Sequence, residues 1–236
     1  MNPKKKILNS YHLTFKIFKT IINKRYPNKS KVLKLSNEKN LAQKYEVSRA
    51  SLRESLKILQ SKGVILSKQK TGIEIEEISN WNFFDRDILN WTQSSKYSID
   101  IAKYFLETRL IIEPENAYLC SERIDKKGKE KLNNAFDNLH YNVKNQDVKN
   151  IINADLEFHK IILFGTENPI LHSFNSFISH ILKYNFELNH KDYNVYEKWK
   201  IALPLHNNLK NHIISHKSKL AKRVMYNIIN NTNKIK

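Results

Sequence analysis

The sequence predicts a mainly α-helical protein in two parts: a small helical domain with a short β-hairpin over residues 1–77, and an all-helical bundle over residues 78–236. Three observations predict this fold class. Apolar residues recur at helical spacing through most of the chain, glycine and proline together are scarce at four and five residues, and a single β-patterned segment lies near residue 70. A hydrophobic content of 40% is enough for a packed core.

The first domain begins with two predicted helices. An apolar stripe at helical spacing predicts a helix that ends before Pro27, and it consists of Tyr11, Phe15, Phe18 and Ile22. After a polar break, Ser36 or Asn37 can cap a short second helix that runs through Lys44, because their side chains can accept hydrogen bonds from the first turn.

A third helix follows after the brief turn at Glu46 and Val47. Ser48 is its predicted cap, it runs to about Ser61, and Gly63 is the left-handed residue that stops it. Two helices separated by so tight a turn indicate a helix-turn-helix.

Basic side chains follow one stripe of that third helix, beside its buried leucines. Arg49, Arg53 and Lys57 are spaced four residues apart and therefore project the same way. Guanidinium groups near the start of a helix are suited to binding in the DNA major groove, because each can form two hydrogen bonds to a guanine or bind a phosphate.

The β-patterned segment predicts a basic hairpin after the third helix. Lys68 and Lys70 lie near its tip, and Gly72 supplies the turn. The domain therefore has a winged helix-turn-helix arrangement, and it carries +12 of the net charge of +18. This combination predicts binding to double-stranded DNA. The alternatives are that the stripe is only a solvated face, or that the winged module packs against protein.

The second domain is predicted to contain six or so helices and no sheet. Their patterns break near residues 126–128, 146–147, 165–169, 189–194 and 216–218. Pro114 should interrupt and kink the first of them. The aromatic segment from Trp81 to Trp91 lacks glycine and proline, so it should be a packed joint between the domains.

Three of these helices place polar groups where core residues are expected. The groups are Arg109 on one helix, Asp155 and His159 on another, and His206 on a third. Burying them costs free energy unless they pair with one another or with a ligand, so we expect a shared pocket for a small molecule, in which Arg109 would prefer a carboxylate. The alternatives are a helical pair of Arg109 with Glu113, four residues on, and a plain hydrogen-bonded pair of Asp155 with His159.

Several classes of protein are excluded by composition. The isolated glycines exclude a glycine-rich phosphate loop or a dinucleotide fingerprint. The single cysteine, Cys120, excludes an internal disulfide and fits a reducing compartment. No apolar run is long enough to cross a bilayer and no secretory signal is evident, so we expect a cytoplasmic protein that does not engage a membrane.

The first domain resembles the winged helix-turn-helix of GntR-type bacterial transcription regulators. The resemblance lies in residues 35–42 (LSNEKNLA), in residues 47–56 (VSRASLRESL, which include Ser51), and in Gly63 and Gly72. It implies that Arg49 and Arg53 contact operator bases and phosphates. It also implies that Lys39, where the family has an arginine, assists them.

The second domain resembles the ligand-binding domain of the FadR-type branch. The matching residues are Glu107–Arg109 with Glu113 and Pro114, residues 155–159, Asn168 with Pro169, His206, Ala221 and Met225. The resemblance implies an all-helical bundle that dimerises, binds a small carboxylic acid and changes operator affinity in response. The tryptophan-bounded segment is similar to that of the galactonate and hexuronate repressors, which favours a sugar acid.

Many members of that branch hold a divalent metal on an aspartate and three histidines. Asp155, His159 and His206 match the first three ligands, while Ile228 stands in the fourth position. Three protein ligands with water or an effector carboxylate could still bind zinc or nickel, although the apolar fourth residue weakens the site. Occupancy by a metal is therefore left open, and the other histidines fit no such pattern.

The main functional hypothesis is an effector-controlled repressor that binds an inverted-repeat operator as a homodimer. The first alternative is an all-helical metal-dependent enzyme that uses Asp155, His159 and His206. The sequence shows no recognisable arrangement of a nucleophile with a base, which argues against it. The second is an architectural DNA binder whose second half only dimerises, and the inward-facing Arg109 argues against it.

Overall fold

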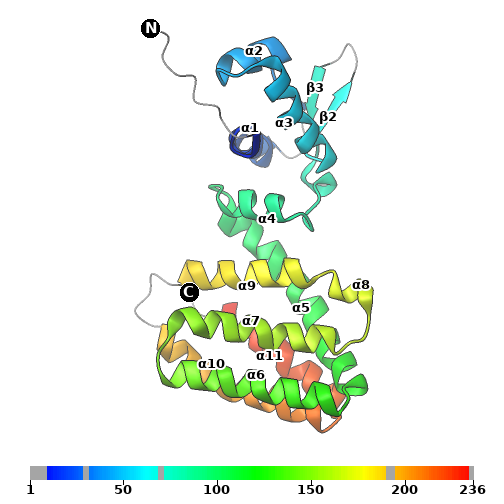
Figure 1. The fold of residues 1–236 in the computed structure, drawn as a ribbon, viewed down its shortest axis with the longest axis vertical. Coiled ribbons are helices and arrows are strands. Elements are labelled where there is room, and N and C mark those ends of the chain that lie inside the picture. Colours follow the sequence, from blue (N-terminus) through cyan, green and yellow to red (C-terminus); the bar gives the residue numbers. More distant parts are fainter. Residues whose placement is uncertain (1–9, 29–31, 69–71, 190–194, 234–236) are drawn as a thin grey trace. The chain divides into compact units, whose positions relative to one another are not determined.

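The structure is a computed structural model that describes residues 10–28, 32–68, 72–189 and 195–233 (Figure 1). The chain divides into two compact units between Ile99 and Asp100. Within the described ranges, none of the helices combines the length and the apolar character that crossing a bilayer requires.

The first unit holds a helix, a helix-turn-helix, a small sheet and a further helix. Its elements are α1 (Ser10–Arg25), a 3-10 turn (Tyr26–Asn28), β1 (Leu33–Lys34), α2 (Glu38–Lys44), α3 (Arg49–Ser61), β2 (Ile65–Lys68), β3 (Gly72–Ile75), a second 3-10 turn (Ile78–Asn80) and α4 (Arg86–Gln93). The predicted helices and hairpin are present, which confirms a winged helix-turn-helix fold for this unit.

The sheet has one strand more than the sequence predicts. Its order is β1-β3-β2 and both pairs are antiparallel, with Ile75 of β3 facing Leu33 on one side and Ile65 on the other. Strand β1 is only two residues long, too short for an alternating pattern to be visible, and it exists because β3 offers it a partner.

The caps of the helix-turn-helix are those that the sequence indicates. Asn37 and Ser48 accept hydrogen bonds from the backbone N–H groups of Asn40 and Ser51, and so begin α2 and α3. Gly63 ends α3 with a φ of 73°, and a Cβ placed there would lie 2.1 Å from the carbonyl oxygen of Asn80. Only glycine fits this position, for both reasons.

The tryptophan-bounded segment packs on the first unit. Trp81 and Trp91 are nearly fully buried, and each ring lies against the ring of Phe18 on α1, with centroids 5.2 and 5.3 Å apart. The predicted boundary between residues 77 and 78 therefore falls inside this unit, which extends to Ile99. The physical reason is that the two indoles complete the apolar core over α1.

The second unit is helical throughout its described part (Figure 1). Its elements are α5 (Ser98–Arg123), α6 (Lys126–Lys144), α7 (Val148–Phe164), α8 (Pro169–His172), α9 (Asn175–Asn189), α10 (Val195–Ile214) and α11 (Ser218–Asn233). Buried side chains of α5, α6, α7, α10 and α11 share one core, in which Ala117, Phe158 and Leu209 meet. The predicted break at 189–194 lies mostly outside the described residues.

Pro114 does not interrupt the first helix of this unit, so the predicted interruption is wrong. Helix α5 continues through it from Ser98 to Arg123. A proline removes one backbone hydrogen bond of the helix. Here its neighbours Glu113 and Ala117 are buried against the rest of the bundle, and this packing holds the helix together.

Candidate DNA-binding and effector sites

The basic stripe of α3 is presented to solvent. Arg49 is the first residue of the helix, and the side chains of Arg49, Arg53 and Lys57 are all exposed, while Leu52 and Leu56 on the other side are buried. The positive end of the helix dipole adds to the charge of Arg49. This face can therefore contact a polyanion without any local unfolding of the helix-turn-helix.

Neighbouring residues hold the start of α3 in place. Ser48 accepts the backbone N–H of Ser51, and the two hydroxyl oxygens are 2.9 Å apart. Arg53 Nε donates to Glu38 Oε2 at 2.8 Å, yet the arginine side chain remains 64% exposed. Lys39, on the same short helix as Glu38, is exposed. Arg53 is thus oriented by α2 and still accessible.

The wing is described only at its base. Gly72 begins β3 with a φ of 91°, a conformation that side chains other than glycine rarely adopt. Lys68 pairs with it as the last residue of β2. The side chain of Lys68 and the whole of Lys70 lie outside the described residues.

In the second unit, a buried carboxylate links two of the predicted polar positions. Arg109 and Glu113 form an ion pair one turn apart on α5, through the guanidinium Nε and Nη2. Glu113 Oε2 also lies 2.7 Å from Nδ1 of His159 on α7. All three side chains are at most 3% exposed. Glu113 therefore ties α5 to α7.

Asp155 brings the remaining positions together. Its Oδ1 lies 3.6 Å from Nε2 of His159, one turn along α7, and 3.1 Å from Nε2 of His206 on α10. The structure thus places Asp155, His159 and His206 around one point, and Arg109 reaches it only through Glu113. The helical pair of Arg109 with Glu113, expected as an alternative, is present.

The cluster shifts the pKa values of its members. Burial alone would raise the pKa of Glu113, but the charges of Arg109 and His159 outweigh it and lower the pKa to about 2. Burial would likewise raise the pKa of Asp155, and the charge of His159 with the nearby His206 lowers it instead. The pKa of His159 is raised because Glu113 and Asp155 overcome its burial. Both carboxylates are therefore ionised at neutral pH.

The donor set fits a divalent cation. His206 Nδ1 is 2.8 Å from the carbonyl oxygen of Ala202, which can only accept, so Nδ1 carries a proton and Nε2, 3.1 Å from Asp155 Oδ1, is the ring nitrogen that could bind a metal. Among the described residues, three buried atoms of the cluster lack a hydrogen bond of good geometry: Asp155 Oδ1, His206 Nε2, and also His159 Nδ1, which lies near Glu113. Ligand atoms about 2.0–2.1 Å from a tetrahedral zinc ion lie about 3.3 Å apart. The two distances from Asp155 Oδ1 bracket that value, and the three ligand atoms all lie within 4.8 Å of one another.

The residue in the fourth family position contributes no ligand. Ile228 on α11 is buried in the apolar core. Glu113 instead faces the outer nitrogen of His159, the arrangement in which a carboxylate orients a metal-binding histidine. Sequence spacing indicates Glu113 as a partner of Arg109, but its contact with His159 joins two helices and has no local signal.

Two family models match the chain. The model described as "Bacterial regulatory proteins, gntR family" matches residues 21–75, and the model described as "FCD domain" matches residues 104–231, more than half of the chain. The first match contains α2, α3 and the wing, and the second contains Glu113, Asp155, His159 and His206.

Curated relatives match over part of their length. The chain is 28% identical to the galactonate operon transcriptional repressor of Escherichia coli over 65% of this chain and 66% of that protein. It is 30% identical to the uncharacterized HTH-type transcriptional regulator YieP of E. coli over 60% of this chain and 62% of that protein. These matches thus span less than two thirds of either relative. Both relatives are transcription regulators rather than enzymes.

Solved structures share the fold at low sequence identity. A GntR protein of Streptococcus agalactiae has a TM-score of 0.53 and 20% identity, with 95% of this chain and 99% of that chain covered. E. coli McbR/YncC has a TM-score of 0.54 and 15% identity, with 97% of both chains covered. The winged helix-turn-helix, the helical second unit and the two family models agree: the chain belongs to the GntR family of bacterial regulatory proteins, in the FadR-type branch that carries an FCD domain.

Proposed function

We propose that the protein is a DNA-binding transcription repressor whose operator affinity is controlled by a small carboxylic acid. The observation that carries this proposal is the exposed pair Arg49 and Arg53 at the capped start of α3, in a unit with a winged helix-turn-helix fold. Such a helix fits the major groove, where arginine can pair with guanine and with phosphates.

The effector is a sugar acid bound at the buried polar cluster of the second unit. The name of the galactonate repressor supports this class of ligand. In the cluster, Arg109 is bonded to Glu113, so it contributes positive charge and orientation, and the imidazoles of His159 and His206 lie beside Asp155, whose negative charge opposes an anion unless a cation is bound there. If a zinc or nickel ion is bound, Asp155, His159 and His206 hold it, and it supplies positive charge for the effector carboxylate.

Regulation requires that the effector favour one of two arrangements of the DNA-binding units. We propose a homodimer on an inverted repeat, because two α3 helices must enter successive major grooves about 34 Å apart. An effector that binds one arrangement more tightly shifts the population toward it, and a difference of about 1–3 kcal/mol changes operator affinity 5- to 150-fold.

The test is operator selection followed by a binding assay. An operator is selected from a random duplex library with the full chain, and binding is measured by gel shift over a range of salt. Arg49→Ala and Arg53→Ala should each weaken binding by about 1–3 kcal/mol. Lys126→Ala, an exposed change on α6, is the matched control and should have no effect. Unaltered operator binding by both arginine variants would contradict the proposal.

A further inference from the structure

Asn116 is a buried polar side chain to which the described residues offer no hydrogen bond. It lies on α5, is 2% exposed, and neither its Nδ2 nor its Oδ1 has a hydrogen-bond partner among the described residues. An amide that is removed from water without a partner costs free energy of folding, so native proteins seldom keep one. A second buried asparagine shows the usual case: Asn142 of α6 donates to the carbonyl of Asn138 at 2.7 Å.

Asn116 lies on the same face of α5 as Arg109 and Glu113 of the polar cluster. It follows Arg109 by seven residues, which is two turns or about 10 Å along the helix and almost the same angle around it. Glu113 lies between them on the same buried face, whereas Ile111 and Glu115 are exposed on the other face. The next residue, Ala117, packs in the core with Phe158 of α7 and Leu209 of α10.

The chemistry of an amide limits what can satisfy it. Asn116 offers N–H donors and a carbonyl acceptor side by side. A hydroxyl group can both accept from the first and donate to the second, whereas a carboxylate can only accept and a methylene can do neither. A ligand that carries hydroxyls along a carbon chain therefore matches Asn116, while its carboxylate goes to the positive charges of the cluster.

We infer that Asn116 is a specificity-determining residue of the effector site, which reads a hydroxyl group and so selects polyhydroxylated acids over plain aliphatic acids. The inference rests on the proposed effector function and adds to it the residue that distinguishes a hydroxylated acid from a plain one. A site built to bind a hydroxyl strongly rejects the analogue that lacks it, because the polar group of the site is then left unpaired.

The test compares two six-carbon acids and two asparagines in the full-length chain. The probes are D-galactonate, which carries a hydroxyl on each carbon of the chain beyond the carboxylate, and hexanoate, which carries none. Affinity is measured by calorimetry and stability by thermal unfolding, for the wild type, Asn116→Ala, Asn116→Ser and the control Asn142→Ala. The Ser variant retains a hydroxyl that can both donate and accept.

Galactonate should bind the wild type and hexanoate should not. Asn116→Ala should lower galactonate affinity about tenfold or more, and Asn116→Ser should lower it less. The free Asn116→Ala protein should unfold at or near the wild-type temperature because no hydrogen bond is lost. Asn142→Ala should unfold at a lower temperature and bind galactonate as the wild type does.

Three results would overturn the inference: equal binding of hexanoate and galactonate by the wild type, unchanged galactonate affinity in Asn116→Ala, or a loss of stability in that variant as large as in Asn142→Ala. Failure of the wild type to bind either acid would overturn both the sugar-acid effector and this role. A wild type that binds galactonate but no operator would instead overturn the proposed DNA-binding function and leave the role of Asn116 standing.

Discussion

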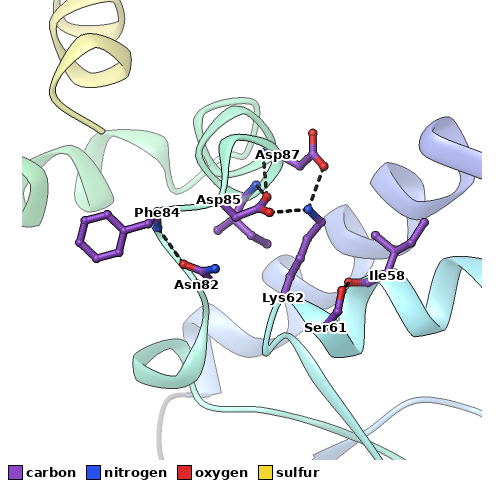
Figure 2. Close-up of polar contacts among 8 residues, drawn as sticks. Ile58, Ser61, Lys62, Asn82, Phe84, Asp85 and Asp87 are labelled. Atoms are coloured by element: carbon purple, nitrogen blue, oxygen red, sulfur yellow. Dashed lines mark hydrogen bonds and ion pairs between the residues drawn. The ribbon is translucent and has the colours of Figure 1, made fainter. Parts of the chain in front are cut away.

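Lys62 Nζ lies 2.6 Å from Asp85 Oδ2, which joins the C-cap residue of α3 to the N-cap residue of α4 (Figure 2). Asp87 Oδ2 is 2.9 Å from the same nitrogen, and the ring of Trp91 lies 5.7 Å away. The lysine side chain is only 11% exposed. The end of the basic helix is therefore bound to the first turn of α4 by a charged contact that is mostly shielded from water.

Removal of this contact should destabilise the first unit. Lys62→Met keeps most of the length of the side chain and loses its charge, and we expect a loss of about 2 kcal/mol because two carboxylates lose a charged hydrogen-bond donor. Urea unfolding of the full chain measures it. Lys57→Met removes an exposed lysine of the same helix and should change stability little. Equal effects of the two changes would argue against the contact.

The same contact predicts a dependence on alkaline pH. Burial alone would lower the pKa of Lys62, but its hydrogen bonds to Asp85 and Asp87 raise it above 10.5. A raised pKa in the folded state means that the stabilisation is complete below pH 10.5 and is lost as the pH rises through the folded-state value. The stability difference between the wild type and Lys62→Met should be constant near neutral pH and shrink above pH 10.5. A difference that grows with pH would contradict the assignment.

Arg109→Ala should cost more stability than an exposed arginine. It removes the guanidinium whose charge helps to lower the pKa of Glu113, so the buried carboxylate must either remain as an unpaired charge or bind a proton. We expect a loss of about 3–5 kcal/mol, partly recovered in the double variant Arg109→Met/Glu113→Leu. Operator affinity should persist while the effector response disappears. Urea unfolding and gel shifts measure the two effects, and an effector response like that of the wild type would exclude Arg109 from the site.

Zinc should bind the cluster of Asp155, His159 and His206. Chain that is purified without a histidine tag, stripped with a chelator and dialysed against zinc should hold about one ion per chain by elemental analysis and should unfold at a higher temperature. His206→Ala should abolish both effects. Ile228→His restores the fourth ligand of the family pattern and should tighten zinc binding. Zinc retained by the His206→Ala protein would place the ion elsewhere.

Gly165 should tolerate no side chain. A Cβ there would lie 2.4 Å from Sγ of Cys120, and Cys120 is fully buried. Gly165→Ala should therefore cost about 1–3 kcal/mol through overpacking. The double variant Gly165→Ala/Cys120→Ala should recover part of the loss, because the sulfur atom is removed. Additive effects of the two changes in thermal unfolding would show that they do not share a space.

Burial also makes this thiol unreactive. It raises the pKa of Cys120 to about 12, so almost no thiolate exists near neutral pH. A disulfide reagent at pH 8 should label Cys120 only as fast as the chain unfolds. Fast labelling of the folded protein would contradict its burial.

The helices of the first unit could be predicted from the sequence because their signals are local. The caps Asn37 and Ser48, the stop at Gly63 and the basic stripe of α3 each depend on residues within a turn or two of one another. Strand β1 could not be predicted from the sequence, because its two residues form a strand only beside β3.

The candidate effector site could be predicted in part from the sequence. Helical spacing predicts that Arg109, Asp155, His159 and His206 lie on buried faces, since each stands within an apolar stripe that packs against the rest of the bundle. Only the tertiary structure shows that Glu113 joins α5 to α7, and that the buried amide of Asn116 lacks a hydrogen-bond partner in the described residues.

The sequence alone thus determined the two-part helical architecture and the residues that are candidates to read DNA, because capping, periodicity and charge are local properties. Tertiary structure decided that Trp81 and Trp91 belong to the first unit, that α5 continues through Pro114, and that Glu113 stands between Arg109 and His159. The physical reason is that burial and ion pairing depend on which helices pack together, and no spacing along one helix carries that information.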